Sequence, residues 1–345
     1  MFLHGLATAR PPAKFTQQDC WEIARRSPAV ARLHGRSQFI LQKVLTGDNG
    51  IATRHFAVNN LDRITDLSAD ELNAAFRSEA PRLALAALRP ALEQARVAPA
   101  QLDALLICTC TGYLCPGLTS YVAEELGLRA DAWLQDLVGL GCGAAIPMLR
   151  AASHILAARP DATVACIAVE VCSAAFYLDN DPGVLISACL FGDGAAASIW
   201  RAQPGASGLR CFEFNTLHWP AERDRLRFET RDGKLRNLLH RSVPEVAARA
   251  VAQLWQERGP RPVKKIISHA GGRDVLTAIE AAVPGYPLAE SAQVLRDGGN
   301  MSSPSVLFAL AEALRGGRNG TGGDYWLVSF GAGFSAHCCR VGAGA

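Results

Sequence analysis

A cysteine between two glycines is the first residue whose surroundings point to covalent chemistry. Cys142 lies in the segment Asp136-Leu-Val-Gly-Leu-Gly-Cys-Gly-Ala-Ala, and a helical pattern begins directly at this cysteine. The N-terminus of a helix stabilises a thiolate through its dipole and its unpaired N–H groups. The flanking glycines permit a tight turn and let an acyl group approach the backbone. Cys142 is therefore a candidate nucleophile; its alternative role is that of a small buried core residue.

Two further polar residues occur where a ligand could meet them. His269 ends a β-rich run that begins at Lys265, and the sequence Ala-Gly-Gly follows it. In a parallel sheet, ligands bind at the carboxyl ends of the strands. Asn300 lies in a glycine-rich turn that leads into a helix, where it could also serve only as a cap or turn residue. The coincidence of the three residues favours a common site over three separate structural roles.

The elements that must position these residues alternate between short apolar runs and helical patterns. Strands are expected at 105–110, 164–170, 195–200, 265–269, 325–330 and 335–341, and helices at 119–126, 142–156, 243–255, 274–282 and 304–314. This alternation predicts an α/β fold with a largely parallel sheet covered by helices. The rhythm restarts after the Gly- and Pro-containing segment 203–208, which predicts two similar halves, residues 1–205 and 206–345.

The composition excludes several classes of function. The 35 basic and 32 acidic residues give a net charge of +3 over 345 residues, too little for a nucleic-acid-binding surface. No uncharged run is long enough to span a membrane, and the N-terminus does not resemble a signal peptide, so we expect a cytoplasmic protein. Eleven cysteines without a CxxC pair indicate reduced thiols and no metal site. The arginine-rich stretch 221–241 mixes both signs of charge, which predicts a solvated loop and helix face.

The three candidate residues, each within its own motif, resemble the catalytic triad of the chalcone synthase-like type III polyketide synthases. The segment Leu190-Phe-Gly-Asp-Gly is similar to the gatekeeper motif of that family and makes Phe191 the gatekeeper. Gly299-Asn-Met-Ser-Ser matches the segment with the catalytic asparagine and adds Ser302 to the cavity. Ser329-Phe-Gly-Ala-Gly resembles the GFGPG loop, with Ala332 in place of proline, and contributes Phe330 and Gly331.

The resemblance covers nearly the whole chain and implies a fold, an assembly and a reaction. The implied fold is the thiolase fold with duplicated αβαβα halves, and family members are homodimers. Cys142 would carry an acyl starter as a thioester, with His269 as its imidazolium partner. His269 and Asn300 would stabilise the enolate that forms when malonyl-CoA loses carbon dioxide, and Phe191 would shield the carboxylate from water. No cofactor is implied beyond the substrates malonyl-CoA and acyl-CoA.

Other interpretations of these motifs stay open. A ketoacyl-carrier-protein synthase would use the same Cys, His and Asn for a single condensation, and a non-catalytic acyl-binding subunit would have lost one of the three. The product could close as a pyrone, a resorcinol, a phloroglucinol or a chalcone. The basic residues that bind CoA phosphates in the plant enzymes are matched only by Lys43, so the starter could come from CoA or from a carrier protein.

The remaining cavity residues differ from those of the plant enzymes. The resemblance places Cys110, Thr111 and Cys115 on a cavity loop. Cys115 occupies the position where a methionine of the plant enzymes reaches across the dimer. A cysteine at the position of Cys110 resembles the bacterial naphthalene-forming members of the family. Cys172 and Ala175 are smaller than their plant counterparts, which predicts room for an aliphatic acyl starter. In another register Phe228 fills the same space and favours a small starter. The second gatekeeper position falls on Arg236 or Asn237.

Overall fold

Nine strands form one continuous sheet in the computed structural model of the chain, which describes residues 1–58, 60, 63–316 and 323–343. Across the sheet the order is β11 (Val263–Ser268), β12 (Asp324–Gly331), β13 (Ser335–Ala343), β8 (Leu209–His218), β1 (Phe2–Ala9), β7 (Gly194–Arg201), β6 (Val164–Glu170), β4 (Ala104–Cys108) and β5 (Trp133–Leu137). One described residue pair, Phe2 with Arg210, joins β1 to β8. Next to this pair, the Cys211 backbone N–H donates to the Met1 carbonyl at 2.8 Å, so the strands before and after residue 205 meet along a short β1–β8 edge.

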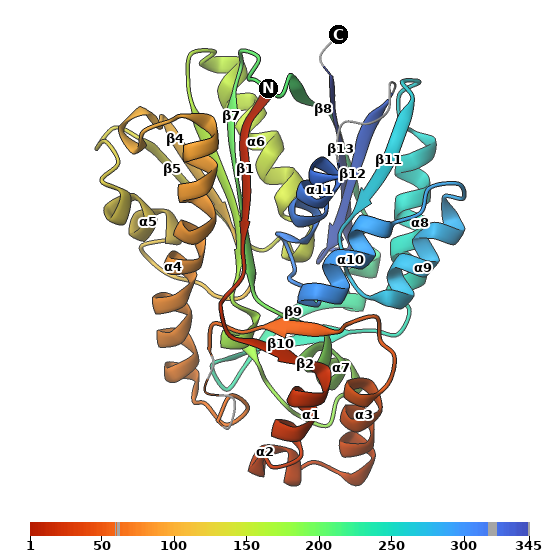
Figure 1. Cartoon of the computed structure of the whole chain (residues 1–345). Coiled ribbons are helices and arrows are strands. Elements are labelled where there is room, and N and C mark those ends of the chain that lie inside the picture. Colours follow the sequence, from red (N-terminus) through yellow and green to blue (C-terminus); the bar gives the residue numbers. More distant parts are fainter. Residues whose placement is uncertain (59, 61–62, 317–322, 344–345) are drawn as a thin grey trace.

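The strands and helices stack in five layers (Figure 1). Helices α6 (Ala145–Ala158) and α11 (Ser305–Arg315) lie between the two parts of the sheet. Helices α4 (Ala69–Ala95) and α5 (Leu118–Leu126) cover the first part from outside. Helices α8 (Val243–Gln256) and α9 (Arg273–Ala282) cover the second. This is the αβαβα arrangement that the resemblance implies.

Helix α4 shows how local sequence builds one of these layers. Ser68 accepts a hydrogen bond from the backbone N–H of Glu71, and the Glu71 carboxylate accepts one from the backbone N–H of Ser68. This reciprocal cap satisfies two backbone donors that the first helical turn leaves free. Alanines at positions 80, 84, 87 and 91 are fully buried, and α4 packs on β1 and β7. Small side chains let the helix lie close to the sheet.

The expectation of a largely parallel sheet is wrong. Only β4–β5, β4–β6 and β11–β12 pair in parallel among the eight neighbouring pairs of the described sheet. The central strands β6, β7, β1, β8 and β13 pair antiparallel. Of these, β6 and β7 are buried along almost their whole length, so their sequences are nearly continuous apolar runs like those of parallel strands. Hydrophobic pattern alone does not distinguish the two cases.

A smaller lobe lies below the five layers in Figure 1. It has its own apolar cluster, which includes Cys20, Leu41, Phe56 and Leu185. Its elements are α1 (Gln17–Ala24), α2 (Pro28–Ala31), α3 (Gly35–Thr46), α7 (Pro182–Leu190), the strands β2 (Lys14–Thr16) and β3 (Thr53–His55), and the hairpin of β9 (Leu226–Arg231) and β10 (Lys234–Leu239). Helix α10 (Ala289–Gly298) packs against β3.

The mixed charges of the arginine-rich stretch 221–241 predicted a solvated loop and helix face, and this prediction is wrong. After a short turn it forms the β9–β10 hairpin. Arg236 is 12% exposed and donates to Asp179 and Glu229, each at 2.7 Å. Because these ion pairs neutralise the buried guanidinium, the strand can turn its alternate residues inward. The charge pattern concealed this alternation.

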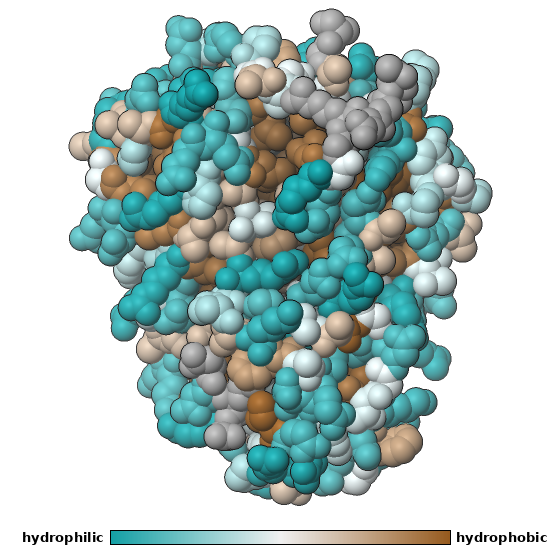
Figure 2. Space-filling view, viewed as in Figure 1, coloured by the Kyte–Doolittle hydropathy of each residue, from teal (hydrophilic) through white to brown (hydrophobic). Residues whose placement is uncertain are grey.

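Charged and polar side chains cover most of the molecular face in Figure 2, with apolar side chains between them over the upper strands. Within the described residues, no helix combines the length and the apolar character needed to cross a membrane. The same part of the chain holds no cluster of three or more His, Cys, Asp or Glu side chains suited to a metal ion.

Candidate active site

Cys142 lies in a short 3₁₀ turn, Gly141–Gly143, between β5 and α6. The helix begins at Ala145, three residues later than the sequence pattern indicated. Gly141 has φ +59°, a conformation that favours glycine. A Cβ atom on Gly331 would lie 2.9 Å from the backbone nitrogen of Cys142 and 2.6 Å from that of Gly143. The end of β12 therefore packs directly against the cysteine turn, and a side chain at Gly331 would displace that turn.

Ser302 connects Cys142 to the asparagine segment. Its hydroxyl donates to the Cys142 sulfur at 3.2 Å and lies 3.1 Å from the Cys110 sulfur. Ser302 has φ +58°, which is strained for a residue with a side chain. The side-chain oxygen of Asn300 accepts from the Ser302 backbone N–H at 2.8 Å and holds this conformation. The strained turn thus serves to bring a hydroxyl to the candidate nucleophile.

Asn300 is held by bonds to the segments that carry Phe191 and His269. Its backbone N–H donates to the Leu190 carbonyl at 2.9 Å, and its own carbonyl accepts from Gly192 at 3.1 Å. Its side-chain amide donates to the Gly271 carbonyl at 3.1 Å. The three motifs are therefore locked together by hydrogen bonds of one residue.

His269 directly follows β11, and its backbone N–H donates to the Val328 carbonyl on β12 at 2.9 Å. The ring packs edge to face on Phe330, with 5.2 Å between centroids and an angle of 72° between planes. Its Nδ1 atom is buried and has no hydrogen-bond partner in the described structure. The imidazole is thus positioned by packing, with a nitrogen free for another partner.

Cys142, His269, Asn300, Phe191 and Phe330 line one cavity of about 580 Å³. The structure therefore brings together five residues from five distant segments of the chain. A volume of this size accommodates a small-molecule substrate.

The protonation of the site is set by burial. Cys142 is 5% exposed, and burial raises the pKa of its thiol to about 12, partly offset by the Ser302 hydroxyl. Burial lowers the pKa of His269 to about 3. A neutral thiol and a neutral imidazole are favoured because low-dielectric surroundings disfavour both charged forms. The shifts therefore oppose the resting thiolate–imidazolium pair expected from the sequence.

The mouth of this cavity carries basic side chains. Lys43 on α3 lines it, together with Arg241 and Arg273. Arg273 contacts Asp48, which limits the net positive charge. Sequence reasoning identified Lys43 and missed the two arginines, because they come from the second half of the chain and share no motif with it.

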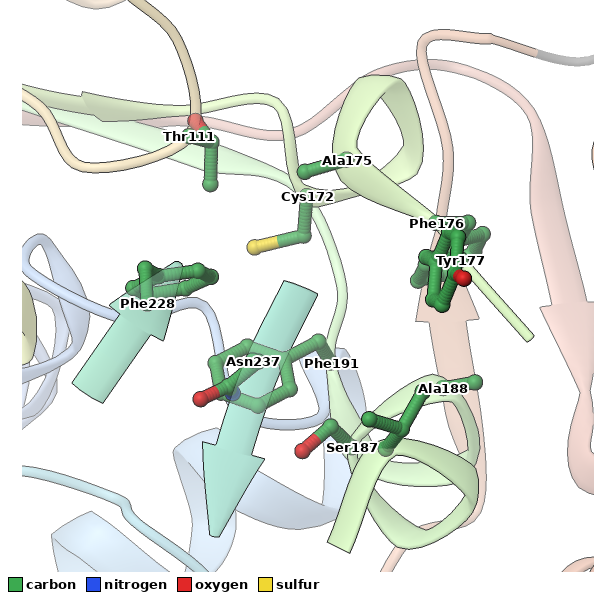
Figure 3. Close-up of a pocket in the computed structure, with 11 residues that line it drawn as sticks. Thr111, Cys172, Ala175, Phe176, Tyr177, Ser187, Ala188, Phe191, Phe228 and Asn237 are labelled. Atoms are coloured by element: carbon green, nitrogen blue, oxygen red, sulfur yellow. The ribbon is translucent and has the colours of Figure 1, made fainter. Parts of the chain in front are cut away.

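Phe191 also lines a second, smaller pocket (Figure 3). Its volume is about 30 Å³, roughly that of one water molecule. Cys172 and Ala175 line it from one side and Phe228 from another. Phe228 thus occupies the space that the small Cys172 and Ala175 side chains leave. In the part of the chain that the structure describes, this pocket is too small for a long acyl chain, which favours the narrow-cavity alternative.

The register of the hairpin is also settled. Asn237 pairs with Phe228 across β9 and β10, and both line the small pocket. Arg236 instead forms the ion pairs with Asp179 and Glu229. Of the two residues considered for the second gatekeeper position, Asn237 is therefore the one in the pocket.

Glu170, at the end of β6, fixes the loop that carries Cys110 and Thr111. One carboxylate oxygen accepts from the Cys110 backbone N–H and the Thr111 hydroxyl, both at 2.9 Å. The other accepts from the Ser303 hydroxyl at 2.5 Å. Burial raises the pKa of Glu170, while these hydrogen bonds act in the opposite direction. Thr111 lines the small pocket, and Cys110 lies beside Ser302.

Cys115 lies outside both pockets and is exposed. All eleven cysteines are described, and none forms a disulfide within the chain. Exposed large apolar residues occur on the same loop and on the neighbouring edge strand β5: Tyr113, Trp133, Leu134 and Val138. This part of the sheet edge is unusually apolar for a surface.

Known proteins are similar to this chain in both sequence and fold. A family model described as FAE1/Type III polyketide synthase-like protein matches residues 8–217, and one for the C-terminal part of 3-oxoacyl-[acyl-carrier-protein] synthase III matches residues 258–342. A 1,3,6,8-tetrahydroxynaphthalene synthase of Streptomyces peucetius subsp. caesius is 30% identical over 353 residues, covering 95% of this chain and 89% of that protein. A 3,5-dihydroxyphenylacetyl-CoA synthase of Streptomyces toyocaensis is 29% identical over 357 residues, covering 98% and 88%.

The crystal structure of 1,3,6,8-tetrahydroxynaphthalene synthase from Streptomyces coelicolor superimposes with a TM-score of 0.88 at 24% identity, covering all of both chains. The two proteins therefore share one fold, the αβαβα thiolase fold that the motifs implied. The chain belongs to the type III polyketide synthase family. It is an acyltransferase-type condensing enzyme, and the matches over the whole chain support this function over a ketoacyl-carrier-protein synthase.

Proposed function

We propose that Cys142 carries the growing acyl chain and that His269 and Asn300 promote condensation with malonyl-CoA. The observation that supports this most strongly is their convergence, with Phe191, on one cavity of about 580 Å³. The reaction uses acyl-CoA and malonyl-CoA as substrates and no further cofactor.

Loading begins with a neutral Cys142, because burial raises its pKa. The thiol proton passes to His269, and the sulfur attacks the thioester carbonyl of the starter. The new C–S bond forms as the bond to the CoA sulfur breaks, and the proton leaves with CoA. Ser302, which donates to the Cys142 sulfur, stabilises its developing negative charge.

Extension begins when malonyl-CoA loses carbon dioxide and the electrons of the broken C–C bond form an enolate. Donors on His269 and Asn300 stabilise the enolate oxygen. The carbanion attacks the Cys142 thioester, a C–C bond forms, and the C–S bond to Cys142 breaks. The extended chain leaves on CoA and returns to Cys142 for the next round.

Phe191 stands between the two pockets and excludes water from the malonyl carboxylate. Lys43, Arg241 and Arg273 at the mouth suit the phosphates of CoA, which favours CoA over a carrier protein as the donor of the starter. We assign Cys110, Thr111, Cys172, Ala175, Phe228, Ser302, Phe330 and Gly331 to the walls of the substrate cavity.

The narrow pocket behind Phe191 supports a small starter and a short oxygenated product. Relatives named for tetrahydroxynaphthalene, dihydroxyphenylacetyl-CoA and phloroglucinol form products of this kind. We therefore propose a polyhydroxylated aromatic product over an alkylpyrone or alkylresorcinol. Mass spectrometry of products from acetyl-, malonyl-, hexanoyl- and octanoyl-CoA with malonyl-CoA tests this. Efficient extension of octanoyl-CoA would contradict it.

The active protein is proposed to be a cytoplasmic homodimer with residues 1–205 and 206–345 as its two halves. The apolar side chains of Tyr113, Trp133, Leu134 and Val138 around the edge strand β5 support a dimer that covers this edge, with Cys115 beside it. Free cysteines agree with a reducing compartment. Sedimentation equilibrium of wild type and Leu134→Arg tests the assembly; a monomeric wild type contradicts it.

A further inference from the structure

Asn237 places an unsatisfied polar atom at the wall of the small pocket. Its side-chain oxygen is buried and has no hydrogen-bond partner in the described structure. The residue faces Phe228 across the β9–β10 hairpin, and both line the pocket with Cys172 (Figure 3). A buried carbonyl oxygen without a donor is costly, which makes it an unusual wall for an otherwise apolar pocket.

The hydroxyl groups of Thr111 and Ser187 in this pocket are already engaged. The Thr111 hydroxyl donates to Glu170 at 2.9 Å and accepts from the Val171 backbone N–H at 3.0 Å. The Ser187 hydroxyl donates to the Gly183 carbonyl at 2.7 Å. The other walls include the apolar side chains of Ala175, Phe176, Val184, Phe191 and Phe228. Tyr177 and Cys172 also line the pocket, and in the described structure neither donates to Asn237. An occupant of the pocket is therefore the group left to supply the partner.

The chemistry of the acyl chain decides which occupant can supply that partner. A poly-β-keto chain carries an oxygen on every second carbon, and its enol form presents an O–H donor. An alkyl chain of equal length has no donor and would leave the carboxamide oxygen of Asn237 without a hydrogen bond.

We propose that Asn237 is a specificity-determining residue that hydrogen-bonds an oxygen of the acyl chain bound to Cys142, so that the enzyme favours β-oxygenated chains over alkyl chains. This inference rests on the proposed function of Cys142. Phe228 limits the length of the chain, while Asn237 selects its polarity. Two facing residues of one hairpin thus control two different properties of the bound chain.

The test compares two four-carbon starters, acetoacetyl-CoA and butanoyl-CoA, which differ in the oxygen at C3. The wild type should favour acetoacetyl-CoA in kcat/KM by on the order of 10-fold, the usual effect of an unsatisfied buried polar group. Asn237→Leu, similar in size but without the acceptor, should bring the ratio close to one. Asn237→Asp keeps an oxygen in place and should retain most of the preference.

Leu238→Gln, at the neighbouring position on β10, is the matched control and should leave the ratio unchanged. Malonyl-CoA decarboxylation and acyl loading on Cys142 are measured in the same variants. If loading is intact and Asn237→Leu keeps the wild-type ratio, the role of Asn237 is refuted and the proposed function stands. Loss of the preference in both Asn237→Leu and Asn237→Asp refutes the hydrogen bond in favour of shape. Absence of loading in the wild type refutes the proposed function and the inference together.

Discussion

The two pockets that meet at Phe191 differ in size, polarity and construction. The larger is about 580 Å³, opens past basic side chains and contains Cys142, whereas the smaller is about 30 Å³ and largely apolar. The larger pocket is built by loops that backbone and side-chain hydrogen bonds of Asn300 hold together. A hairpin outside the main sheet closes the smaller one. We propose that bond-making takes place in the larger pocket and chain selection in the smaller one.

The largest effect should follow the loss of Cys142, which lines the larger pocket. Cys142→Ala should abolish acyl loading and product formation, because no other side chain holds the chain between condensations. Cys142→Ser should retain little activity. Loading is read by intact-protein mass spectrometry after incubation with acyl-CoA. Polyketide formation by Cys142→Ala at the wild-type rate would show that the nucleophile lies elsewhere.

Replacing the hydrogen-bond donors His269 and Asn300 should slow the decarboxylation of malonyl-CoA in the larger pocket without altering which acyl chains the enzyme selects. His269→Gln and Asn300→Ala should each lower malonyl-CoA decarboxylation on the order of 10²- to 10³-fold, as for the loss of an oxyanion donor. Carbon dioxide release measures this directly. A reduction below threefold in both variants would remove the two residues from the decarboxylation step.

The pH dependence of thiol alkylation sharpens the same point. The pKa of Cys142 is raised to about 12 and that of His269 is lowered to about 3, so alkylation by iodoacetamide should rise steadily above pH 8. Because a neutral His269 does not stabilise a thiolate by charge, His269→Gln should leave the midpoint in place. A midpoint near pH 6 in the wild type that rises in His269→Gln would instead establish the ion pair.

Opening the smaller pocket should change chain selection without affecting chemistry. Phe228→Gly should raise kcat/KM for hexanoyl-CoA relative to acetyl-CoA by about 10-fold, since each newly buried methylene contributes roughly 0.8 kcal/mol. Ala175→Trp should act in the opposite direction. Malonyl-CoA decarboxylation serves as the control and should stay near the wild-type rate. Equal hexanoyl-CoA use by wild type and Phe228→Gly would contradict the role of the pocket.

The smallest effect is expected at the mouth of the larger pocket. Lys43→Ala and Arg273→Ala should raise KM for malonyl-CoA about 2- to 5-fold with kcat unchanged, because exposed ion pairs contribute less than about 1 kcal/mol. Added salt should reduce the difference from wild type. Arg89→Ala, an exposed arginine on α4, is the control. A loss of kcat in Lys43→Ala would indicate a role beyond binding.

The sequence was most informative where the candidate functional residues lie in short local motifs. Cys142, His269, Asn300 and Phe191 each lie in a motif of a few residues, and the structure gathers all four in one cavity. The strand directions were not predictable, because strands buried on both faces have the same apolar pattern in parallel and antiparallel sheets.

The size of the small pocket could not be predicted from the sequence for a different reason. Phe228 and Asn237 contribute to it only through their cross-strand register, and arginines on the same hairpin concealed the inward-facing alternation. The contributions of Arg241 and Arg273 depend on contact between distant segments. Such information is absent from local spacing.

The β9–β10 hairpin pairs with no strand other than its own partner in the described chain, and its tip turns at Asp232 and Gly233 in the left-handed conformation. The sheet and its helices therefore keep their hydrogen bonds when residues on the inner face of the hairpin change. An evolving lineage can alter the length and polarity of its product through this face while retaining the arrangement around Cys142. Chemical diversification is thereby uncoupled from the stability of the catalytic scaffold.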